Sequence, residues 1–152
     1  MDAIAVSVPA WGACALLAAT VACDVRSRRI PNAIPLALLG LFAAYAALGN
    51  LAHASALWAH LATGAALLAA GFALHLTGRF GAGDGKLLAV CGLWLGPADL
   101  GPFLFGMALC AFALSGFALL PFEKARRMRS ELPFAVAIAP PAALVLLGRT
   151  LT

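Results

Sequence analysis

The chain has 152 residues, of which 64% are hydrophobic and only 11% are charged. Soluble domains are about a quarter charged and roughly half apolar, so a water-soluble fold of this length is excluded, because it could not bury so much apolar surface. The net charge of +4 does not indicate nucleic-acid binding, because the basic residues gather in short clusters between apolar stretches. The composition therefore predicts a protein that is solvated by the lipid bilayer.

Six apolar stretches predict an all-α, polytopic membrane helix bundle that forms one domain over residues 1–152. A helix rises about 1.5 Å per residue, so the fourth stretch covers only about half of the hydrocarbon core. We expect it to begin inside the protein, after a glycine-rich loop that dips to membrane depth. We expect Trp11, Trp58 and Trp94, near span ends, to anchor the helices at the membrane interface. The predicted spans are residues 5–23, 33–49, 56–77, 86–96, 101–121 and 134–149.

The basic residues predict the orientation of these spans. Nine of the ten Lys and Arg residues lie in or at the edges of loops 24–32, 78–85 and 122–133, whereas loops 50–55 and 97–100 carry none. Because cytoplasmic loops are enriched in Lys and Arg, the first three loops are expected in the cytoplasm and both termini outside.

Two of the six acidic residues lie where a charge is costly. Asp24 and Asp84 each lie at the predicted cytoplasmic edge of an apolar span, beside a non-helical break. One interpretation is that they anchor helix ends by pairing with Arg26, Arg28 or Lys86. The other is that the two carboxyl groups meet and share a proton, so that one acts as a base and the other as an acid. That arrangement would hydrolyse a peptide without a metal, and the four cysteines form no CxxC pair that would indicate zinc.

The residues around Asp84 favour a shaped loop. Gly81, Gly83 and Gly85 permit sharp turns and close backbone approach, and they leave room for an extended peptide. Lys86 either stabilises an ionised Asp84 or contacts the substrate backbone. A phosphate-binding loop is excluded because Lys86 is followed by leucine rather than Ser or Thr.

The residues after Asp24 predict a short connection to the next helix. Pro31 restricts Ile30 to extended conformations, and Asn32 is expected to cap the helix that follows.

These two stretches together resemble the paired motifs of the type IV prepilin peptidases, which are membrane aspartic peptidases of the GxGD type. The resemblance lies in D-x-x-x-x-x-I-P-N from Asp24 to Asn32 and G-x-G-D-x-K from Gly81 to Lys86. A later stretch, from Leu132 to Ala139, is similar to the proline-phenylalanine segment that opens the family's last helix. The resemblance spans about residues 11–147.

The resemblance implies that Asp24 and Asp84 are the catalytic pair and that no cofactor or metal is needed. It implies cleavage of a prepilin or pseudopilin leader at the cytoplasmic face of the bacterial inner membrane. Larger relatives carry an N-terminal cytoplasmic region with CxxC pairs that is linked to N-methylation. No such region is present in this sequence, so peptidase activity alone is expected. The short form is similar to enzymes of tight-adherence (Flp-type) pilus systems.

Two other functions use the same residues. The aspartates of a small proton- or cation-coupled transporter would relay ions across the membrane. A non-catalytic subunit of a pilus or secretion machine would bind the same partners without cleaving them. The sequence predicts neither the oligomeric state nor the cleavage-site preference.

Overall fold

The computed structural model describes residues 3–27, 29–51, 53–78, 80–118 and 134–151, and helix is the only regular secondary structure among them. This confirms the predicted all-α membrane bundle, although the predicted loop 122–133 lies outside the described residues. The helices are α1 (Ala3–Ser27), α2 (Ala33–Tyr45), which continues into the π-helical turn η1 (Ala46–Asn50), α3 (Ala54–Leu76), α4 (Ala82–Leu95), α5 (Leu100–Ala118) and α7 (Phe134–Leu151).

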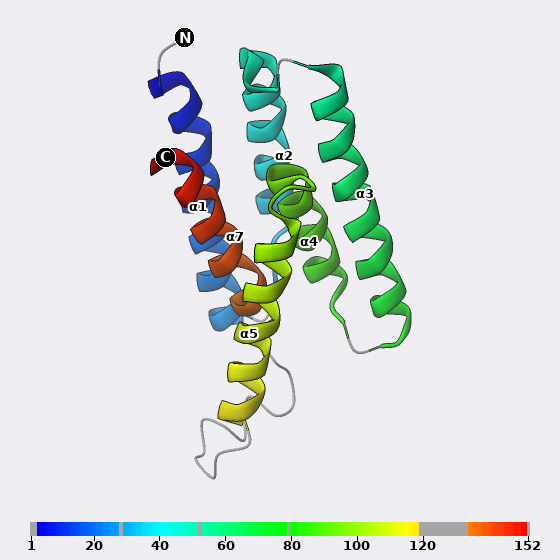
Figure 1. The fold of residues 1–152 in the computed structure, drawn as a ribbon. Coiled ribbons are helices and arrows are strands. Elements are labelled where there is room, and N and C mark those ends of the chain that lie inside the picture. Colours follow the sequence, from blue (N-terminus) through cyan, green and yellow to red (C-terminus); the bar gives the residue numbers. More distant parts are fainter. Residues whose placement is uncertain (1–2, 28, 52, 79, 119–133, 152) are drawn as a thin grey trace.

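The helices run up and down in succession (Figure 1). The start of α1 and the end of α7 lie at one end of the bundle, which we call the terminal end. Residues 29–32 and 80–81, which follow α1 and precede α4, lie at the other end, which we call the loop end. This alternation places the two sequence motifs at the same end of the molecule.

Within the described residues, three helices are long and apolar enough to cross a membrane: α1 from Val8 to Ser27, the whole of α3, and α5 from Leu100 to Phe117. Two further apolar helices, Ala33–Gly49 and Phe134–Arg149, are shorter. With 14 residues, α4 extends only about 21 Å along its axis, against about 30 Å of hydrocarbon. The expectation of a short fourth helix is therefore correct.

The short helix α4 is the centre of the bundle and packs against α2, α3 and α7. A helix that is apolar on every side is stable only when it is enclosed. Nine of its 14 residues are buried: Gly85, Leu87, Leu88, Ala89, Val90, Cys91, Gly92, Trp94 and Leu95. A short helix is thus kept in place by its neighbours and not by contact with lipid.

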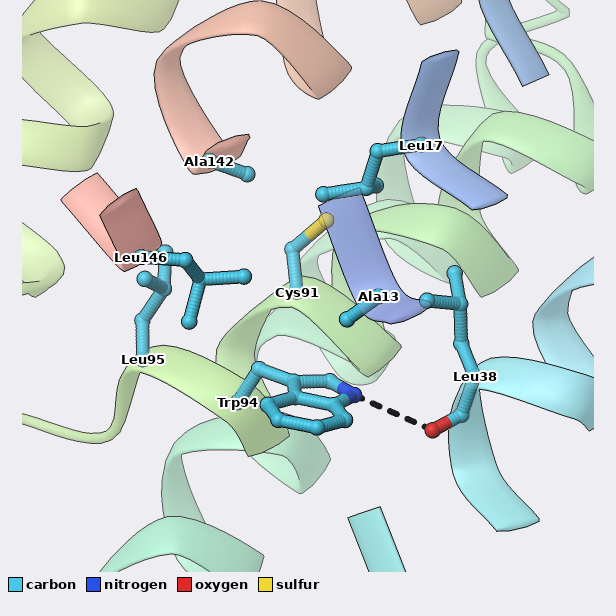
Figure 2. Close-up of a pocket in the computed structure, with 8 residues that line it drawn as sticks. All are labelled: Ala13, Leu17, Leu38, Cys91, Trp94, Leu95, Ala142 and Leu146. Atoms are coloured by element: carbon cyan, nitrogen blue, oxygen red, sulfur yellow. Dashed lines mark hydrogen bonds between the residues drawn. The ribbon is translucent and has the colours of Figure 1, made fainter. Parts of the chain in front are cut away.

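Figure 2 shows the part of this core where α4 meets α1, α2 and α7. The indole Nε1–H of Trp94 donates a hydrogen bond of 3.0 Å to the carbonyl oxygen of Leu38. Trp94 is only 3% exposed, so its assignment as an interface anchor was wrong, whereas Trp11 and Trp58 are exposed. The space between these side chains is too narrow to admit a water molecule. The surrounding residues are Ala13, Leu17, Leu38, Cys91, Trp94, Leu95, Ala142 and Leu146.

Arg149, near the end of α7, caps the carboxyl end of α4. Its guanidinium donates to the carbonyl oxygens of Trp94, at 3.2 Å, and Leu95, and it forms an ion pair with Asp99. The last carbonyl groups of a helix have no partner within the helix, so a fork of N–H donors is well suited to this position. We call this set of contacts the Arg149 cap.

Replacing Arg149 with lysine should lower the thermal unfolding temperature of the detergent-solubilised protein. Lysine keeps the charge opposite Asp99 but cannot donate to both carbonyl groups in the geometry of a guanidinium, which should cost about 2 kcal/mol. Arg29→Lys, at an exposed position, is the matched control and should leave the transition unchanged. Equal transitions for Arg149→Lys and the native protein would show that the Arg149 cap does not stabilise the fold.

Candidate functional site

Asp24 is buried on α1 with an exposed fraction of 6%. Its Oδ2 accepts a hydrogen bond of 3.1 Å from the backbone N–H of Ala135, in the first turn of α7. The first N–H groups of a helix lack partners within the helix, and they favour a negative charge beside them. Asp24 therefore joins α1 to the beginning of α7.

The predicted end of the first helix at residue 23 was too early. The helix continues to Ser27, whose Oγ donates to the carbonyl oxygen of Cys23 at 2.8 Å. No glycine or proline lies between Asp24 and Pro31, so helix is favoured for another turn. Asp24 consequently faces the packed interior and does not end the helix.

Asp84 lies in the first turn of α4, at the loop end and outside the helices that qualify as membrane spans. The predicted non-helical loop over 81–85 is wrong for its later residues, because α4 begins at Ala82 and includes Gly83 and Gly85. Gly81 is extended and precedes the helix. An acidic side chain in the first turn is stabilised by the helix dipole, which helps α4 to begin here.

The two carboxyl groups are close enough to interact. Burial, and after it the negative charge of Asp24, raises the pKa of Asp84 from 3.8 to about 6, while a backbone hydrogen bond from Gly81 acts in the opposite direction. The fold thus brings together two acidic side chains that lie far apart in the sequence. Their environments differ. Asp24 accepts a hydrogen bond from α7, whereas Asp84 is half-buried in the first turn of α4.

The glycines of the second motif serve close packing and not left-handed turns. A Cβ atom on Gly71 of α3 would lie 2.8 Å from the Cα atom of Gly85, so the two helix backbones touch there. A Cβ atom on Gly81 would lie 2.6 Å from Oδ2 of Asp84, and one on Gly83 would lie 3.4 Å from Cβ of Ile30. Of the two uses expected for these glycines, close backbone approach is the one that the structure displays.

The two motifs are also joined by a polar contact. The ammonium group of Lys86 donates to Oδ1 of Asn32 at 3.0 Å. Asn32 precedes α2 as expected, but its side chain makes no capping hydrogen bond. The expected side-chain cap was therefore wrong, because Lys86 offers a charged donor that the sequence alone did not place nearby. Pro31 contributes its carbonyl oxygen, which accepts from the N–H of Ile34 at 3.0 Å.

Three contacts close to the site were not predicted. The ring of Phe80 packs on that of Phe134, with centroids 5.4 Å apart, and Nδ1 of His75 lies 2.7 Å from the carbonyl oxygen of Phe80. The N–H of Ala135 is the other unpredicted partner, and no sequence signal could reveal it because every residue except proline carries that group. Within the described ranges, no three His, Cys, Asp or Glu residues are grouped so that they could hold a metal ion.

The fold and the site together define a class of protein. It is a membrane protein whose helical bundle has apolar spans and two interacting carboxyl groups at one end. A model of the type IV leader peptidase family matches residues 11–121, and the chain belongs to that family. It is therefore a membrane-embedded peptidase. No curated protein and no solved structure matches the chain. The family match includes both aspartate motifs and ends before α7.

Replacing Gly71 with alanine should separate α3 from α4 and destabilise the protein by about 1–3 kcal/mol, since the new methyl group would meet the backbone of Gly85. The measurement is thermal unfolding in detergent. Gly40→Ala is the control, because its Cβ atom would meet nothing within 4 Å. If both variants unfold at the native temperature, the contact between Gly71 and Gly85 is not tight.

Replacing Asp24 with asparagine should lower the pKa of Asp84 from about 6, because the neighbouring negative charge is lost. The value should stay above 3.8, since burial is the larger cause and remains. Carbon-13 NMR titration of labelled aspartate in micelles measures this change. Asp99→Asn, at the other end of α4, should leave the titration unchanged, and an identical curve for Asp24→Asn would contradict the proximity of the two groups.

Proposed function

We propose that this peptidase is an aspartic endopeptidase that cleaves the leader from type IV prepilin or pseudopilin precursors, with Asp24 and Asp84 as its catalytic pair. The observation that carries the proposal is the effect of the Asp24 charge on Asp84. Carboxyl groups that influence each other's protonation can hold one proton between them, and this is the arrangement that activates water in metal-free peptidases.

The surroundings of the two groups favour different roles. The N–H of Ala135 at the start of α7 stabilises negative charge on Asp24, which suits a general base. The raised pKa of Asp84 lets it keep its proton to a higher pH than an ordinary carboxyl group, which suits a general acid.

The reaction then proceeds in two steps. Asp24 takes a proton from water as the water oxygen attacks the scissile carbonyl carbon, and Asp84 gives its proton to the carbonyl oxygen. In the second step the carbon–nitrogen bond breaks, and the leaving amine takes the proton from Asp24. Asp84 recovers its proton as the carbonyl re-forms, so the enzyme returns to its initial state.

The location of the reaction is part of the proposal. The positive-inside rule places the loop end in the cytoplasm, so the leader would be cleaved at the cytoplasmic face of the bacterial inner membrane. The short sequence resembles peptidases of tight-adherence (Flp-type) pilus systems, and we propose a precursor of that kind as the first substrate to test.

The purified protein in liposomes should cleave a prepilin once, and sequencing the product should locate the new N-terminus at the leader boundary. Asp24→Asn and Asp84→Asn should each reduce kcat by at least about 100-fold, the contribution expected from a general acid or base. Asp99→Asn makes the same chemical change at the terminal end and should retain activity. Normal cleavage by either Asp24→Asn or Asp84→Asn would overturn the proposal and leave a transport or assembly role.

A further inference from the structure

The connection between α3 and α4 is short and is held together by His75. α3 ends at Leu76 and α4 begins at Ala82. The N–H of Gly78, whose φ of 74° is left-handed, donates to the carbonyl oxygen of His75 at 2.9 Å. On the other side of the turn, Nδ1 of His75 lies 2.7 Å from the carbonyl oxygen of Phe80. Because a carbonyl oxygen only accepts, Nδ1 carries the hydrogen, and His75 holds Phe80 to the last turn of α3.

The ring of Phe80 in turn packs on α7. Its partner is Phe134, the first residue of that helix, with ring centroids 5.4 Å apart and ring planes inclined by 58°. This geometry lies within the range of favourable aromatic pairs. The contact joins the α3–α4 connection to the beginning of α7, and we call it the aromatic clasp.

Each ring of the clasp lies one residue before a backbone group that bonds one of the aspartates. The first ring precedes Gly81, which provides a backbone hydrogen bond to Asp84. The second ring precedes Ala135, whose N–H donates to Oδ2 of Asp24 at 3.1 Å. Successive Cα atoms are 3.8 Å apart across a planar peptide bond, so a displaced ring displaces the group that follows it.

The exposure of these side chains favours a positioning role over a stabilising one. Both rings of the clasp are half-buried, and His75 is exposed. Stabilisation by apolar contact scales with the surface that is removed from water, so partly exposed contacts contribute less to folding than the enclosed contacts of α4 do. Loss of the clasp should therefore change the local geometry more than the stability of the bundle.

We propose that the aromatic clasp fixes the distance between the carboxyl groups of Asp24 and Asp84, and that Phe80, Phe134 and His75 are positioning residues for this pair. The importance of that distance for catalysis rests on the peptidase function proposed above. The proposal adds to that function three residues that hold the reacting groups without taking part in the reaction.

The first experiment measures how strongly Asp24 acts on Asp84, and it needs no substrate. This coupling is the fall in the pKa of Asp84 on Asp24→Asn, measured by carbon-13 NMR titration in micelles. In a Phe80→Ala background the fall should be at most about half as large, since the interaction weakens with distance and with screening by water. Phe80→Tyr keeps the ring and should keep the coupling. Phe105→Ala, at an α5 position that is 74% exposed, is the control and should also keep it.

The same titration tests the other two members. His75→Ala should weaken the coupling as Phe80→Ala does, whereas His75→Asn should preserve it, because the amide nitrogen of asparagine can replace the Nδ1 donor. Phe134→Ala and the double variant Phe80→Ala/Phe134→Ala should each weaken the coupling to the same extent as Phe80→Ala, because the rings act as a pair.

The second experiment measures prepilin cleavage by the full-length protein in liposomes. Phe80→Ala and His75→Ala should each lower kcat by about tenfold to 100-fold, the cost expected of misplaced catalytic groups, and leave KM close to the native value. Phe80→Tyr and His75→Asn should restore kcat.

Native coupling in Phe80→Ala would overturn the proposal, as would effects of the two phenylalanines that add in the double variant. A raised KM with native kcat would also overturn it, because the ring would then bind substrate. If Phe80→Ala fails to fold, His75→Ala decides the question, since it changes only an exposed side chain. Failure of the proposed function is separate: it would be seen as cleavage by Asp24→Asn or Asp84→Asn, whatever the coupling is.

Discussion

The contact between the backbones of α3 and α4 at Gly71 and Gly85 is the constraint on which the position of the site depends. α4 is too short to be held by the two faces of a membrane, so its depth is set by the helices that enclose it. Where Gly71 touches Gly85, neither helix has a side chain to hold the other away. Asp84 lies one residue before this contact, and its distance from α1 and Asp24 therefore follows from it.

The two aspartates show how one kind of residue acquires two environments. Asp24 is enclosed at a helix–helix junction and is bonded to the first turn of α7. Asp84 lies at the start of a helix, among glycines, with part of its surface open. A carboxyl group that is fixed and hydrogen-bonded stabilises charge, whereas one that is partly desolvated beside a like charge retains its proton. The asymmetry of the helix packing thus gives the two carboxyl groups different surroundings.

Much of this architecture could be predicted from the sequence. Long apolar runs indicate which segments are helices, and clusters of arginine and lysine indicate how the helices alternate in direction. The helix ends around Asp24 and Asp84 could not. The charge of Asp24 suggested the end of an apolar span, and the glycines around Asp84 suggested a loop, where the structure has helix in both places. Trp94 was misplaced for a related reason: its indole N–H finds the carbonyl oxygen of Leu38, a partner that no local pattern reveals. Asparagine is a residue type favoured at helix N-caps, but the side chain of Asn32 instead accepts a hydrogen bond from Lys86, which comes from a distant part of the chain. The family's motifs identified the neighbourhood of the site, and packing determined its geometry.

α7 reaches both ends of the bundle. At the loop end the amide of Ala135 bonds Asp24, which precedes it by 111 residues, and at the terminal end Arg149 closes α4. Because a chain is synthesised from its N-terminus, α1 and α4 enter the membrane before either contact is available. The hydrogen bond from α7 to Asp24 therefore forms only after α7 has been synthesised, so that a partly synthesised chain holds both carboxyl groups without it.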